Sequence, residues 1–222
     1  MRTSFQSAFA LAACLFTAGL AVAQDEWPQT THDGLELQDT DSTAVVYWRP
    51  GATLQGYTKV YLVEAPVAFK KNWKRNQNTS TMGIGNKVTS SDMEKIKQTL
   101  SEEFRRVFVE ELESDGRLEV VDELGEDVVV IKPAIINLDV AAPDVRNTER
   151  NVSMVTSAGE MTLYLEFYDA VTGEIFGRVL DRKVDDKFNF AMQANRVSNK
   201  RDADKILKAW ASALREHIGK LD

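Results

Sequence analysis

Cysteine is almost absent from the sequence, since Cys14 is the only one among 222 residues. It lies in an apolar run that follows the charged Arg2 and ends in Ala21-Val22-Ala23, small residues of the kind that a signal peptidase recognises. The run is shorter than a permanent membrane span. We therefore expect residues 1–23 to be a cleaved secretory signal peptide, which makes the protein periplasmic. The remaining chain would contain no cysteine, so disulfides are excluded and the fold must depend on its hydrophobic core.

An alternative is lipid attachment at Cys14, because Leu11-Ala12-Ala13-Cys14 matches the small-residue pattern that precedes an acylated cysteine. Only residues 8–13 would then form the apolar core of the signal, which is shorter than usual. The mature chain would also begin with an apolar stretch where a polar spacer is normal. These objections favour the soluble product over the membrane-anchored one, and either product belongs to the bacterial cell envelope.

Histidine is scarce as well, and His32 and His217 are too far apart in the sequence to predict a common zinc site. The sequence contains neither Gly-x-Ser-x-Gly nor Ser-x-x-Lys, which are typical of serine nucleophiles. The glycine pattern at residues 83–88, GIGNKV, lacks the third glycine of a dinucleotide-binding loop. We therefore predict no catalytic residue, no metal site and no cofactor.

Basic residues are in a minority, with 27 Lys and Arg against 34 Asp and Glu. An acidic chain lacks the positive face that nucleic acid or anionic lipid requires, so neither is predicted as a general partner. Carboxylates are plentiful, in the clusters Asp122-Glu123-Glu126-Asp127 and Asp185-Asp186. They are the candidates for acid–base chemistry if the protein is instead a hydrolase that acts on peptidoglycan or glycan.

Two segments have the period of an amphipathic helix. The first begins at Ser91, which is expected to form a capping box with Glu94, and its apolar stripe extends to Leu112. The second is C-terminal, and its apolar side is expected to contain Ile206, Leu207, Trp210, Ala213, Leu214, Ile218 and Leu221. Both stripes must pack against another apolar surface.

Alternating apolar residues predict strands at 45–48, 57–69, 118–121 and 128–140, and a hairpin of 161–168 with 174–184. In the strand 128–140, Ala134, Ile136 and Leu138 are expected to share one face, with a bulge at Pro133. Strands that follow one another usually pair. We therefore predict an α+β fold: a two-layer sandwich in which two helices lie on one face of a mostly antiparallel sheet of about four to five strands. Residues 45–222 would form this single domain, preceded by a polar, poorly ordered leader at 24–44.

One short segment, FKKNWKRN at residues 69–76, reverses the acidic character of the chain. Four cations surround an aromatic side chain, an arrangement that suits glycans, anionic groups or acidic partners. The partner-binding residues predicted from it are Lys70, Lys71, Trp73, Lys74 and Arg75. The simpler interpretation is that Trp73 covers the core while the cations stay solvated.

The stretch VYWRPGATLQGYTKVYL, residues 46–62, resembles a family of uncharacterised bacterial envelope proteins, catalogued as domain of unknown function 3313. Trp73, the start of the first helix and the segment AIINLDVAAP extend this resemblance to the C-terminus. Many members are described as lipoproteins. This sequence differs from them, because Cys14 is poorly placed for lipid attachment. The family has no established activity, so the resemblance implies no catalytic residues.

Together these features predict an exported envelope protein that is a non-enzymatic binding or assembly module, with an envelope protein or a cell-wall component as its partner. The alternatives are the carboxylate-dependent hydrolase and a purely structural envelope component. The sequence does not identify the partner.

Overall fold

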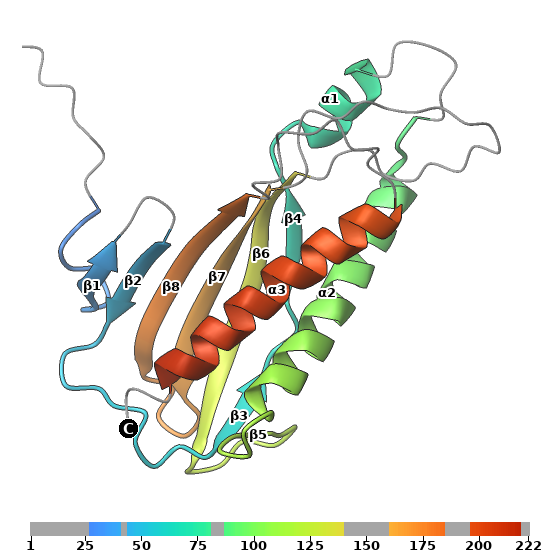
Figure 1. The fold of residues 1–222 in the computed structure, drawn as a ribbon. Helices are drawn as coiled ribbons and strands as arrows, with labels where there is room; N and C mark the ends of the chain where they lie inside the picture. The colour runs from blue at the N-terminus through green and yellow to red at the C-terminus, as the bar shows by residue number, and fades with distance from the viewer. Residues whose placement is uncertain (1–26, 41–43, 81–86, 140–159, 185–195, 219–222) are drawn as a thin grey trace, which may run out of the picture.

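The computed structural model describes residues 27–40, 44–80, 87–139, 160–184 and 196–218 (Figure 1). The expected signal peptide with Cys14, most of the glycine pattern at 83–88 and Asp185-Asp186 lie outside the described residues. The strands are β1 (Glu36–Thr40), β2 (Ala44–Trp48), β3 (Lys59–Leu62), β4 (Val67–Phe69), β5 (Glu119–Val120), β6 (Val128–Asp139), β7 (Glu160–Asp169) and β8 (Ile175–Val184). The helices are α1 (Trp73–Ser80), α2 (Ser90–Leu112) and α3 (Arg196–Ile218).

The strands form one mixed sheet in the order β1-β2-β8-β7-β6-β3-β5, and β4 also pairs with β6. Every pair from β1 to β6 along this order is antiparallel. The pairs β3–β6, β4–β6 and β3–β5 are parallel. The fold class is therefore α+β as predicted, but the sheet has eight strands rather than four or five, and a third helix is present.

Helices α2 and α3 lie side by side across the same face of the sheet, as Figure 1 shows. Phe104 and Phe108 of α2, Leu207 and Trp210 of α3 and Phe167 of β7 are all buried in the resulting core. Burying each of these large side chains contributes about 1.5–3 kcal/mol. The apolar stripes of the two helices and one face of the sheet thus bury one another.

The start of α2 corrects one detail of the sequence prediction. Its N-cap is Thr89, whose hydroxyl accepts from the backbone N–H of Asp92, while the Asp92 carboxylate accepts from the backbone N–H of Thr89. This is a capping box two residues before the one expected at Ser91 and Glu94. Two overlapping matches to the same motif stand in the sequence, and the structure uses the first.

The predicted hairpin is present as β7 and β8, joined at Asp169–Glu174. Gly173 has φ 71°, a left-handed conformation that glycine adopts without a steric cost. The Asp169 carboxylate accepts hydrogen bonds from the backbone N–H groups of Val171 and Thr172. These bonds fix the turn that joins the two strands.

Strand β6 differs from its prediction. Ile135 is fully buried on the helix-covered face, whereas Ala134 and Ile136, which were expected there, are half-buried on the other. The irregularity lies at Asn137, with φ 54°, and not at Pro133, which pairs regularly with Leu165. This bulge shifts the alternation by one residue, so that Leu138 returns to the core.

Three further segments correct the sequence prediction. The strand expected at 57–69 is divided into β3 and β4, with Pro66 between them. The leader expected to be irregular at 24–44 contains β1, which pairs with β2, and its Leu35 is fully buried. Residues 70–90, which separate the expected strand at 57–69 from the expected helix at Ser91, contain α1. Polar sequences conceal β1 and α1, because their apolar residues are too few to show a period.

Candidate functional site

The described helices leave the second face of the sheet uncovered. Residues that alternate with the core positions project from this helix-free face, among them Tyr164, Glu166 and Tyr168 of β7. The N-terminal residues cover the part over β2 and β8, where Leu35, Val45, Tyr47 and Ile175 form a second small core. Beyond it, over β6 and β3, the face is open to a groove.

A charged network joins the N-terminal segment to this face. The Arg178 guanidinium donates to the carboxylates of Asp33 at 2.8 Å and Glu166 at 2.9 Å. The hydroxyls of Tyr164 and Tyr168 donate to Glu166 at 2.5 Å and 2.8 Å. The side chains of Arg178, Asp33 and Glu166 are 19%, 24% and 17% exposed, so solvent screens their attraction only in part.

The protonation states in this network are fixed at neutral pH. The Thr31 hydroxyl, and after it Arg178, lower the pKa of Asp33 to about 2. Burial works to raise the pKa of Glu166, but hydrogen bonds from Tyr164, Tyr168 and Arg178 outweigh it and lower the pKa. Carboxylates that stay ionised in this way are poor proton donors.

The two tyrosines of the network stay neutral. Burial, followed by the neighbouring Glu166, raises the pKa of both Tyr164 and Tyr168 to about 12. Their hydroxyls therefore remain hydrogen-bond donors. The network binds segments of the protein together and is not arranged as an acid–base pair.

The tyrosine groove has a volume of about 330 Å³ and is open to solvent. Its lining combines aromatic and aliphatic side chains with two charged ones: Tyr61, Val63, Leu124, Val130, Lys132, Tyr168, Asp169, Ala170 and Gly173. The Lys132 ammonium lies 4.2 Å from the centre of the Tyr168 ring, a cation–π contact. Leu124 is 60% exposed at its rim.

Asp169 lines the tyrosine groove, and hydrogen bonds hold its carboxylate in place. The Tyr57 hydroxyl donates to its carboxylate at 2.5 Å. Hydrogen bonds from the Thr172 backbone N–H and then from Tyr57 lower the pKa of Asp169 to about 2. Burial, followed by Asp169, raises the pKa of Tyr57 to about 12. The groove wall is therefore preorganised and carries a permanent negative charge.

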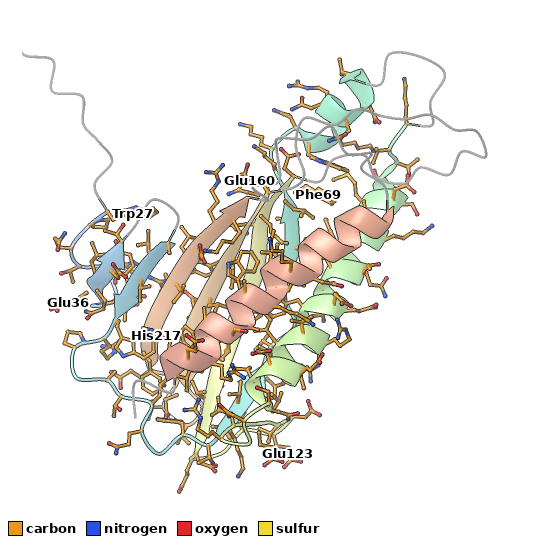
Figure 2. The ribbon with its side chains drawn as sticks, in the orientation of Figure 1. Trp27, Glu36, Phe69, Glu123, Glu160 and His217 are labelled. Carbon is orange, nitrogen blue, oxygen red and sulfur yellow. The ribbon has the colours of Figure 1, made fainter. Side chains whose placement is uncertain are left out.

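The predicted partner-binding patch lies at the other end of the sheet. Figure 2 shows Phe69 and Glu160 at this end and Glu123 at the end where the tyrosine groove lies. Trp73 is 3% exposed and stacks on Phe69 with ring centres 4.2 Å apart, so its ring is part of the core and is not offered to a ligand. A left-handed Asn72, with φ 63°, precedes it in the turn from β4 into α1.

The four cations of the patch have different environments. Lys70 is 3.4 Å from both Asp139 and Glu160, and these carboxylates, Glu160 first, raise the pKa of Lys70. The Lys74 ammonium donates to the Ser90 hydroxyl at 2.9 Å. Lys71 and Arg75 are exposed. Lys70 and Lys74 thus have polar partners within the protein, whereas the Trp73 ring is buried and is not exposed among the cations.

The other candidate residues are dispersed. Asp122 pairs with Arg105 at 3.2 Å and Asp127 with Lys59 at 3.0 Å, as surface ion pairs. His217 is exposed on α3. Within the described ranges, no three His, Cys, Asp or Glu side chains are grouped so that they could hold a metal ion. Among the described helices, none has both the length and the apolar character needed to cross a membrane.

Sequence reasoning missed Tyr61, Lys132 and Tyr168 as site residues. One signal for them was present, because Tyr164, Glu166 and Tyr168 alternate with core residues and so had to share the second face. No local pattern could place Tyr61 beside Tyr168, since β3 and β7 meet only through β6.

Solved structures with a similar arrangement of elements match this chain with low sequence identity and low TM-scores. A PelC dodecamer from Paraburkholderia phytofirmans is 11% identical, with 78% of this chain and 97% of that chain covered and a TM-score of 0.37. A neuraminyllactose-binding hemagglutinin homolog from Helicobacter pylori is 13% identical, with 78% and 95% covered and a TM-score of 0.35. A protein from Xanthomonas campestris that matches DUF330 is 12% identical, with 76% and 86% covered and a TM-score of 0.35.

A comparison with curated proteins gave no significant match. The family model described as "Protein of unknown function (DUF3313)" matches residues 29–214, which include β1 as well as the helices and the hairpin. The match covers far more than half of the chain and agrees with the resemblance seen at residues 46–62. The chain therefore belongs to the DUF3313 family of proteins of unknown function.

Proposed function

We propose that this protein is a non-enzymatic binding module of the bacterial periplasm, which contacts an envelope protein or a cell-wall component through the helix-free face of its sheet. The observation that carries the proposal is the tyrosine groove. Its apolar and aromatic lining is open to solvent. These residues are not needed to form the main core, which consists of the other sheet face and two helices. Such surfaces mark interaction sites.

The chemistry of the carboxylates supports binding over hydrolysis. A hydrolase that uses two carboxyl groups needs one that holds a proton near neutral pH. Asp33, Glu166 and Asp169 all have a lowered pKa, and each accepts several hydrogen bonds. A residue in that state stabilises structure and does not exchange protons with a substrate.

Photo-crosslinking in intact cells tests the proposal. A photoreactive phenylalanine derivative replaces Tyr61 in the groove, and in a control protein it replaces the exposed Thr99 on α2. We expect a discrete higher-mass adduct at position 61 and not at position 99. Equal labelling at both positions, or none at position 61, would contradict the proposal. Mass spectrometry of the same sample reads the mature N-terminus and tests export.

A further inference from the structure

Building on the proposed function, we propose that the tyrosine groove binds a basic polypeptide segment of another protein, which inserts one bulky apolar side chain beside Tyr61 and Tyr168. The groove provides an apolar binding site for that side chain, and the charges around the groove determine which kind of segment binds.

The size and openness of the groove favour a side chain over a whole small molecule. Its volume of about 330 Å³ is at the lower end of the range for ligand pockets, roughly 300–1,000 Å³. Val130 pairs with Tyr61 on one side and with Tyr168 on the other, so it lies between the two tyrosines. Val63 also lines the groove, and Leu124 is 60% exposed at the rim. Val171, in the neighbouring turn, is 65% exposed. A partner residue that enters here would cover these side chains from water.

The rim of the groove is acidic. Residues 121–127, the connection between β5 and β6 that carries Leu124, contain four acidic side chains and no basic one. Glu123 and Glu126 flank Leu124 and are exposed. Within residues 121–127, ion pairs with Arg105 and Lys59 offset Asp122 and Asp127, which leaves the charges of Glu123 and Glu126. Inside the groove, the charges of Lys132 and Asp169 cancel. The surplus is negative, so a cationic partner is attracted and an anionic one repelled.

The backbone of α2 adds to this field. The helix ends at Leu112, at the same end of the sheet as residues 121–127 but on the face opposite to the groove, so the negative end of its dipole lies at that end of the molecule (Figure 1). Its last turn contains no basic residue to offset that dipole. The acidic side chains and the helix end thus have the same sign at this end of the molecule.

Peptide binding tests the inference with the full mature protein. The probe is a fluorescein-labelled Ser-Lys-Lys-Trp-Lys-Lys-Ser peptide, compared with versions in which Glu replaces every Lys or Ala replaces Trp. We expect anisotropy to show binding of the first peptide, none of the acidic one, and about tenfold weaker binding without the Trp. Amide NMR shifts should move at Tyr61, Lys132 and Tyr168.

Charge reversal locates the interaction. The variant Glu123→Lys with Glu126→Lys should weaken binding of the basic peptide about tenfold at low salt, and high salt should remove the difference. The matched control is Glu36→Lys with Asp39→Lys, which changes the net charge equally on the distant β1. An equal loss in the control, or equal binding of the acidic peptide, would overturn the inference.

Two other outcomes are informative. Self-association of the protein in sedimentation experiments, lost in the Glu123→Lys/Glu126→Lys variant, would assign the groove to a second copy and overturn the proposal of a foreign partner. An adduct at position 61 in cells that is unaffected by these two substitutions would leave the proposed function standing and refute the basic segment alone.

Discussion

Replacing Gly177 by alanine should destabilise the fold through a single contact. A Cβ at this position of β8 would lie 1.9 Å from Cε3 and 2.3 Å from Cζ3 of Trp48. Ordinary contact between two carbon atoms requires about 3.5–4.0 Å, so the indole would have to move by more than an ångström. Two interactions hold it in place: its Nε1–H donates to the Ala52 carbonyl at 3.0 Å, and its ring packs against Phe167 with centres 5.6 Å apart.

The magnitude follows from these contacts. Overpacking a core costs about 1–3 kcal/mol. Losing the indole hydrogen bond adds about 1 kcal/mol and losing the aromatic pair about 0.5–1.5 kcal/mol, to the extent that the ring moves away. Replacing glycine by alanine stabilises the fold by about 0.5–1 kcal/mol in the opposite direction, because alanine loses less backbone entropy on folding than glycine does. We expect Gly177→Ala to lower the free energy of unfolding by about 2–3 kcal/mol, measured by urea denaturation with far-UV circular dichroism.

A control and a double-mutant cycle sharpen the test. In Gly125→Ala the new Cβ would meet its nearest atom, Val128 Cγ2, at 3.5 Å, so that variant should stay within about 0.5 kcal/mol of the parent protein. In a Trp48→Leu background, Gly177→Ala should cost at least 1 kcal/mol less than it does alone. If Gly177→Ala is as stable as the parent, or costs the same in both backgrounds, the reasoning about this contact is refuted.

Three more predictions concern stability. The pKa of Asp33 is lowered from 3.8 to about 2, so this carboxylate stabilises the fold above pH 4, and the contribution is lost as the pH falls toward 2. In Asp33→Asn, the unfolding free energy measured across this pH range should therefore decrease by about 2 kcal/mol less on acidification than in the parent protein. Trp73→Ala should lower the free energy of unfolding by about 3–5 kcal/mol in thermal or urea denaturation, since the ring is buried against Phe69. A change near zero would show instead that the Trp73 ring is exposed at the surface. Thr89→Ala should cost about 1 kcal/mol and Ser91→Ala almost nothing, and the reverse order would move the cap of α2 back to Ser91.

The parts of the fold that the sequence predicted are those with a strong local period. The stripe of α2 contains enough large apolar residues, such as Phe104 and Phe108, to identify both the helix and its buried side. The alternation of β7 from Met161 to Phe167 identified the hairpin, because one turn joins strands that are adjacent in space. In both segments, neighbours in the sequence are also neighbours in the structure.

The parts that it did not predict depend on distant partners. The parallel pairing of β3 with β6 has no local signal, since more than sixty residues separate Lys59 from its partner Val128. In β6, the bulge at Asn137 reversed the faces of the residues around it, and asparagine is too common in loops to mark a bulge alone. The tyrosine groove was missed for the same reason, as its residues come from β3, β6, β7 and three connections.

The position of β8 between β2 and β7 also determines when the sheet can be completed. Strands β1 and β2 are made early and pair with each other, but the second partner of β2 at residues 44–48 is the segment 177–181, near the end of the chain. A ribosome adds residues from the N-terminus, so this first pair of strands cannot join the rest of the sheet until almost the whole polypeptide has been synthesised. Any shortened product that stops before residue 175 would expose the inner edge of β2 to other chains. The final fifth of the polypeptide is thus the segment on which completion of the sheet depends.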